Sequence, residues 1–135
     1  GQQTMTFAQL KADPEYIRDN NSEELPPEKF TDEDLQDLSY SSAKQALELD
    51  LLAALQLDEE DANGILDQVT ELNTKRLQVA LANKQLEIYY LNNDRGDGAK
   101  YNYYQRQYNQ SRASFSTLRT GRTAAVGVSI QTFER

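Results

Sequence analysis

The stretch YNYYQRQYNQSRASFSTL, residues 101–118, carries the most regular pattern in the chain. The residues that step by three and four along it are Tyr101, Tyr104, Tyr108, Ser111, Phe115 and Leu118. Residues spaced in this way share one face of an α-helix. A tyrosine buries its ring while its hydroxyl stays hydrated or hydrogen-bonded. We therefore expect a helix here, with Tyr101, Tyr104, Tyr108 and Phe115 at a helix-packing contact or at a partly solvated interface.

The same segment carries arginines on its other faces, so nucleic-acid binding is an alternative. Aromatic rings can stack on bases while guanidinium groups contact phosphates. The helical spacing of the tyrosines favours packing. The acidic first half of the chain also disfavours a surface that binds a duplex.

Two helices are predicted upstream of this segment. Apolar positions that step by three and four, after a capping-box-like start at Thr31, predict a helix over about 32–57. The next helix begins at Asp58 or at the turn Asn63-Gly64, and one apolar face continues to its end near residues 90–92. The connection NNDRGDGAK, residues 92–100, follows. It contains the adhesion tripeptide Arg95-Gly96-Asp97, although a plain loop between helices explains it equally well.

The two ends of the chain differ from this helical body. Residues 1–30 contain three prolines and little core material, which predicts an extended N-terminal arm with one or two short helical turns. Gly121 is a plausible helix stop. The last stretch, TGRTAAVGVSIQTFER, residues 120–135, alternates apolar and polar side chains as a half-buried strand does. The chain is thus expected to be mainly α, with an arm (1–30), a small helical bundle (31–119) and an extended, β-like C-terminal tail (120–135).

A lone strand leaves its backbone N–H and C=O groups unpaired. Four outcomes are open for it: a disordered tail, a hairpin with the N-terminal arm, pairing with a symmetry mate, or addition to the sheet of another protein. We expect this tail to bind a partner. The residues expected to do so are Arg119, Arg122, Val126, Val128, Ile130 and Phe133.

Composition narrows the chemistry. The chain has no Cys, His or Trp, which excludes thiolate or imidazole metal sites, cysteine nucleophiles and histidine bases. We expect no cofactor, no metal and no enzymatic activity. No apolar run approaches the length of a membrane span, so no membrane partner is expected.

The net charge of −8 is unevenly distributed along the chain. Residues 1–71 hold 18 acidic and 4 basic side chains, whereas residues 72–135 hold 4 acidic and 10 basic side chains. Two halves of opposite sign can attract each other within one subunit or between identical copies.

The helical body over 31–118, the segment YYLNNDRGDGAKYNYYQRQY and the tail TAAVGVSIQTFER together resemble the head-to-tail connector, adaptor or head completion proteins of tailed bacteriophages. The resemblance implies a structural virion protein, made in the host cytoplasm, with copies that form a twelve-fold ring in the neck of the particle. In such a ring, Tyr101, Tyr104, Tyr108 and Phe115 would lie either in the helical core or at the interface between copies. Its partners would be a portal-like protein, further copies of itself and a tail protein. DNA would pass through the ring without sequence-specific binding. The alternative is a small cytosolic helical adaptor or secretion chaperone that binds one protein partner.

Overall fold

The computed structural model describes residues 6–20, 39–93 and 98–119. Every regular element in these ranges is helical, and none of them is a strand. The elements, with η for a 3-10 helix, are η1 (Phe7–Gln9), α1 (Pro14–Asn20), α3 (Tyr40–Leu55), α4 (Glu59–Leu72), α5 (Thr74–Asn93), α6 (Ala99–Ala113) and η2 (Phe115–Thr117). The expected mainly helical fold is therefore confirmed for this part of the chain.

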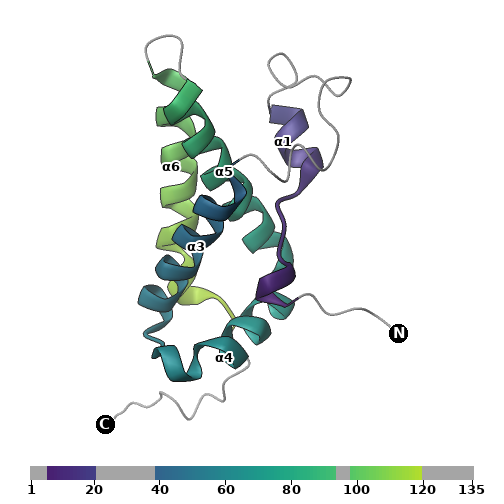
Figure 1. The fold of residues 1–135 in the computed structure, drawn as a ribbon, viewed down its shortest axis with the longest axis vertical. Helices are drawn as coiled ribbons and strands as arrows, with labels where there is room; N and C mark the ends of the chain where they lie inside the picture. The colour runs from purple at the N-terminus through teal and green to yellow at the C-terminus, as the bar shows by residue number, and fades with distance from the viewer. Residues whose placement is uncertain (1–5, 21–38, 94–97, 120–135) are drawn as a thin grey trace.

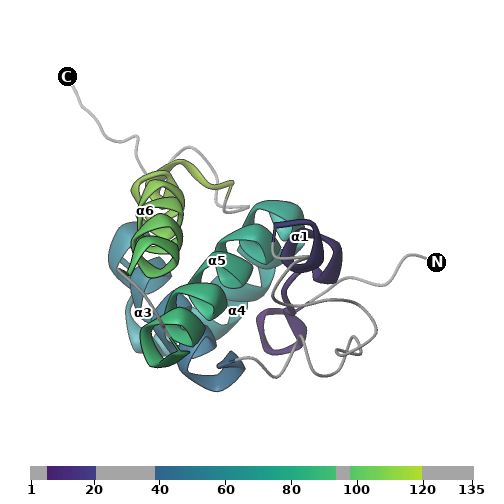
Figure 2. The ribbon, with the colours of Figure 1, turned by 90° about the horizontal axis from the view of Figure 1, so that it is seen from above.

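Helix α5 is the centre of the arrangement. Helix α6 lies alongside it, and α3 packs against the same pair (Figures 1 and 2). Helix α4 crosses one end of this bundle. The turn η1 contacts α4, and α1 contacts α5. Residues from both ends of the chain are thus brought onto one central helix.

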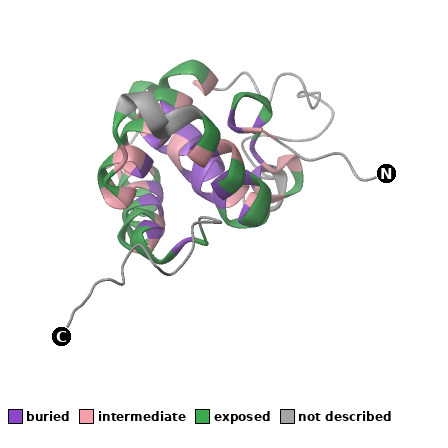
Figure 3. Ribbon diagram, turned by 90° about the horizontal axis from the view of Figure 1, so that it is seen from below, coloured by how far each residue is buried: buried purple, intermediate pink, exposed green. Residues whose placement is uncertain are grey.

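The core lies between these elements, and Figure 3 shows the buried positions facing inward. It is apolar and aromatic. Its largest fully buried side chains are Leu10, Ile17, Leu47, Leu51, Leu77, Leu81, Leu86, Tyr104, Tyr108 and Phe115. The first two show that residues 6–20 share the core of the bundle. The predicted boundary between arm and bundle, near residue 30, lies outside the described residues.

The helix predicted over 32–57 begins later than expected. Ser39 has a φ of 50°, in the left-handed region, so α3 starts at Tyr40. A left-handed residue cannot continue a right-handed helix, which makes the prediction of a helix running through residue 39 wrong. The other end agrees with the sequence, because Gln56 is also left-handed and closes the helix. The predicted capping start at Thr31 lies outside the described residues.

The single long helix predicted after residue 58 is two helices. Asp58 is the N-cap of α4, so the earlier of the two possible starts is the observed one. Asn73 has φ −132° and ψ 32°, which ends α4 before α5 begins at Thr74. The apolar pattern continues across this break, but Leu72 and Leu91 on the predicted buried face are exposed. Periodicity alone does not detect a one-residue interruption.

The tyrosine-rich helix is shorter at its end than predicted. Helix α6 stops at Ala113, and the 3-10 turn η2 takes the chain to Leu118. Ser114 Oγ donates to the Ser111 carbonyl (2.8 Å) and Thr117 Oγ1 donates to the Ser114 carbonyl (2.7 Å). Such local side-chain bonds compete with helical ones and explain the change. The predicted stop at Gly121 and the Arg95-Gly96-Asp97 tripeptide both lie outside the described residues.

Candidate docking site at the root of the C-terminal segment

The side chain of Asn73 holds the last described residue in place. Its Nδ2 donates to the Arg119 carbonyl (2.7 Å), and its Oδ1 accepts from the Arg119 backbone N–H (3.3 Å). Nδ2 also donates to the Val69 carbonyl at the end of α4 (2.8 Å). An amide side chain offers the same donor and acceptor as a peptide group. This Asn73 clasp therefore binds the backbone of Arg119 as a neighbouring strand would, and fixes the position of the residue that precedes the C-terminal segment.

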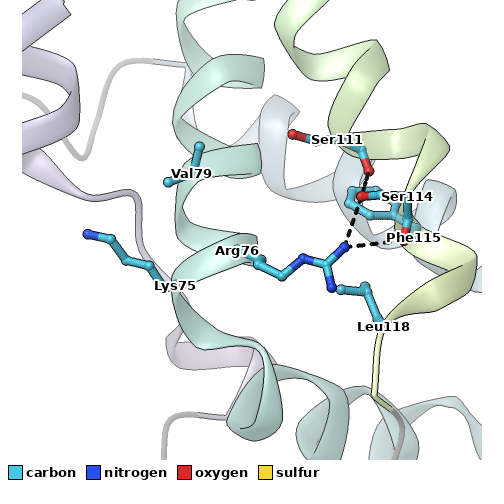
Figure 4. A pocket seen from close by; sticks show the side chains of 7 residues that line it. All are labelled: Lys75, Arg76, Val79, Ser111, Ser114, Phe115 and Leu118. Carbon is cyan, nitrogen blue, oxygen red and sulfur yellow. Dashed lines mark hydrogen bonds between the residues drawn. The ribbon is translucent and has the colours of Figure 1, made fainter.

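Arg76, in the first turn of α5, adds a second attachment. Its Nη2 donates to Ser114 Oγ (3.0 Å), to the Ser114 carbonyl (3.4 Å) and to Thr117 Oγ1 (3.5 Å), as Figure 4 shows in part. These bonds tie η2 to α5. Within the described ranges no carboxylate forms an ion pair with Arg76. In those ranges its guanidinium group donates only to neutral oxygens.

A pocket of about 260 Å³ lies beside these contacts (Figure 4). It is lined by Lys75, Arg76, Val79, Ser111, Ser114, Phe115 and Leu118. The buried Phe115 and Leu118 make it apolar inside, whereas Arg76 and the two serines supply polar groups. We call it the Phe115 pocket.

Lys75 belongs to this pocket only through its stem. Its side chain points to the other side of α5, where Nζ forms an ion pair with Asp13. The hydrogen bond from Lys75 holds the pKa of Asp13 below its ordinary value. Arg76 is therefore the cation that the pocket presents.

Three of the four aromatic residues singled out in the sequence are inside the core. Tyr104, Tyr108 and Phe115 are at most 2% exposed, and Tyr101 is half-buried. The Tyr104 ring stacks on Tyr90 of α5 with centroids 5.8 Å apart, and Phe115 meets Tyr108 edge to face at 6.3 Å. The structure places these three rings at contacts within one chain.

Tyr108 also carries a buried polar contact. Its hydroxyl donates to Asp50 Oδ2 of α3, and Lys84 Nζ lies 4.7 Å from the centre of its ring. Burial, reinforced by the Asp50 carboxylate, raises the pKa of Tyr108 well above its ordinary value. The phenol is therefore a hydrogen-bond donor at neutral pH, and it joins α3 to α6.

The partner-binding residues predicted from the tail fall in two groups. Arg119 is exposed, and only its backbone is held by Asn73. Arg122, Val126, Val128, Ile130 and Phe133 lie outside the described residues. Sequence reasoning did not single out Asn73 or Arg76. The available signal was the pair Asn73-Thr74, two residues that favour helix ends, within an otherwise helical pattern.

Other kinds of site were also sought. None of the described helices combines the length and apolar character that a membrane span requires. Residues 6–20, 39–93 and 98–119 contain no group of three or more side chains suited to hold a metal ion. Comparison of the chain with family models, curated proteins and solved structures finds no match.

Proposed function

We propose that the protein is a structural assembly subunit, and that its C-terminal segment docks onto a partner in the neck of a tailed-phage particle, joining head to tail. The observation that carries the proposal is the Asn73 clasp. It holds both backbone groups of Arg119, so the segment that follows starts from a fixed point. A docking segment with an ordered root loses less conformational freedom on binding than a free one.

The sequence of the segment supports the same use. Val126, Val128 and Ile130 alternate with polar residues, as in a strand with one apolar face. Residues 6–20, 39–93 and 98–119 offer no strand with which it could pair. Addition to the edge of a partner's sheet would pair the N–H and C=O groups of the segment and bury its apolar face against the partner.

A ring of copies around a DNA channel is the assembly that fits this proposal. Head-to-tail contacts between identical chains join two different patches, and they close into a ring when the rotation allows it. The acidic first half and the basic second half provide patches of opposite sign. A portal-like protein would receive the C-terminal segments, a tail protein would bind the other side, and DNA would pass without base-specific contacts.

Deletion of residues 123–135 tests the proposal. The described helices do not include these residues. The number of helical residues, measured by far-ultraviolet circular dichroism, should therefore stay the same. Joining of heads to tails, counted in electron micrographs, should be lost. A truncated chain that still joins them would contradict the proposal.

The segment also offers a matched pair of full-length variants. Val126→Ser, Val128→Ser and Ile130→Ser together remove the apolar face and should abolish joining. Ser129→Ala with Gln131→Ala changes the opposite face and should preserve it. Equal loss in both would show that the alternation carries no docking information. A soluble complex of one copy with one partner would favour the chaperone alternative.

A further inference from the structure

The Phe115 pocket has a chemistry that the docking of the C-terminal segment does not use. At about 260 Å³ it is smaller than the cavities that hold drug-sized ligands, and it suits one large side chain. Its apolar interior, formed with Phe115 and Leu118, favours an aromatic or aliphatic group. The ligand should therefore present a single apolar side chain.

The edge of the pocket adds a charge requirement. All the hydrogen bonds of Arg76 within the described ranges come from Nη2, which leaves Nε and Nη1 as donors for a ligand. A carboxylate binds a guanidinium through two parallel hydrogen bonds. The pocket thus fits an apolar side chain with a carboxylate close beside it.

We propose that the occupant is the stretch Glu28-Lys29-Phe30-Thr31-Asp32 of a second copy of this chain. In an extended backbone, side chains two residues apart point to the same side. Phe30 then enters the pocket with Glu28 and Asp32 on either side, and one of these carboxylates meets Arg76. The Pro26-Pro27 pair favours extended backbone immediately before this stretch.

Chain geometry favours a second copy over the same one. Helix α3 begins at Tyr40, at its end away from α4 (Figure 1), whereas the Phe115 pocket is lined by Lys75 and Arg76 in the first turn of α5. Helix α3 is about 24 Å long at 1.5 Å per residue. The roughly nine residues from Phe30 to Ser39 span about 30 Å at full extension. Covering the length of α3 within the same chain would use most of that extension, whereas a neighbouring copy sets no such limit.

This inference rests on the proposed function, because it assigns one interface of the ring. A stretch on one copy and a pocket on the next form a head-to-tail contact, the type that generates rings. It also gives the acidic half of the chain a specific basic target, Arg76.

A labelled peptide of residues 22–35 provides the test, with fluorescence anisotropy as the readout. The receptor is the full-length chain with Phe30→Ala, so that its own stretch does not compete. Saturable binding is expected. A peptide in which Phe30 is replaced by Ala, or a scrambled peptide of the same composition, should bind at least about tenfold more weakly, because charge alone does not fill the pocket.

Two pocket variants of the receptor separate binding from folding. Ser111→Glu puts a carboxylate at the pocket and leaves the Arg76 bonds to η2 in place, and it should weaken binding about tenfold. Arg76→Glu should do the same, with circular dichroism as a check on its fold. Arg106→Glu makes the same charge change on an exposed position of α6 and should leave affinity unchanged within about twofold.

Several results would overturn the inference. They are a failure of the peptide to bind the Phe30→Ala receptor, equal binding of the scrambled peptide, and equal binding to the Ser111→Glu receptor. Weaker peptide binding to the wild-type chain than to Phe30→Ala at every dilution would place the stretch in its own pocket and overturn the second-copy assignment. Deletion of residues 123–135 removes neither the Phe115 pocket nor residues 22–35. A failure of the C-terminal docking proposal can therefore be distinguished from a failure of this inference.

Discussion

The two ends of the α5–α6 pair are held together in different ways. Where α5 ends and α6 begins, aromatic rings pack: Tyr90 stacks on Tyr104, and Lys100 Nζ lies 5.6 Å from the centre of the Tyr90 ring. At the other end, Asn73 and Arg76 bond to backbone and hydroxyl groups of residues 114–119. Ring packing fixes two helices against each other over a broad area. The polar contacts at the opposite end hold η2 and the backbone of Arg119 through a few directional hydrogen bonds.

The largest expected effect is at the aromatic end. Tyr104→Ala removes a ring that is 2% exposed and should cost about 3–5 kcal/mol in the free energy of unfolding, measured in urea. Tyr103→Ala, next to it and 40% exposed, is the control and should cost less than about 1 kcal/mol. Similar losses in the two variants would mean that the Tyr90–Tyr104 stack does not stabilise the bundle.

The Asn73 clasp should give a smaller but more local effect. Asn73→Ala removes the donor and acceptor used by Arg119 and should cost about 1–3 kcal/mol. Amide hydrogen exchange at Arg119 should accelerate more than exchange in α3. The control Asn109→Ala, at an exposed position of α6, should change neither quantity by much. Unchanged exchange at Arg119 would show that the clasp does not order the root of the C-terminal segment.

Tyr108 links the two kinds of contact, because it has a buried ring and a hydrogen bond to Asp50. Its pKa is raised in the folded chain, so above about pH 10 the unfolded chain loses the phenol proton while the folded chain keeps it. Stability from this group is present below pH 10 and falls as the pH rises further. Tyr108→Phe should cost about 1 kcal/mol at pH 7.

The measurement is urea unfolding of both chains between pH 7 and pH 11. The wild type should lose stability more steeply than Tyr108→Phe above pH 10, because the variant lacks the titrating group. Parallel curves would contradict the assigned environment of the phenol.

The smallest effect is expected at the ion pair between Lys75 and Asp13. The Lys75 side chain is 72% exposed, and such surface pairs contribute less than about 1 kcal/mol. Lys75→Ala should therefore change the urea midpoint only slightly. Any loss should shrink on acidification, as Asp13 becomes protonated below its depressed folded-state pKa. A loss as large as that of Asn73→Ala would erase the distinction between the ion pair and the clasp.

The contrast between ring packing and polar side-chain contacts also explains which features of the fold the sequence could predict. The helical class and the faces of Tyr104, Tyr108 and Phe115 follow from a repeat of three and four, because burial recurs with the helical period. The pair Asn73-Thr74 is only a weak local signal for the break between α4 and α5, and the Asn73 side chain bonds to Arg119, 46 residues away in sequence. No local pattern encodes such a contact.

The candidate site was predicted even less completely. The sequence pointed to the C-terminal segment as the docking element, but not to the residues that hold its root. Arg76 looks like one more surface cation on an amphipathic helix, and only its bonds to Ser114 and Thr117 distinguish it. The Phe115 pocket is formed by α5, α6 and η2 together, so it exists only after these elements have packed.

The most direct test of the account is electron microscopy of the native assembly, purified through a tag on the full-length chain. If the protein is a neck subunit, we expect a closed ring of copies around a channel. Val126, Val128 and Ile130 of each copy should pair with the sheet edge of a portal-like neighbour. A small compact complex of one copy with one partner, or a ring in which residues 123–135 contact no other protein, would contradict it.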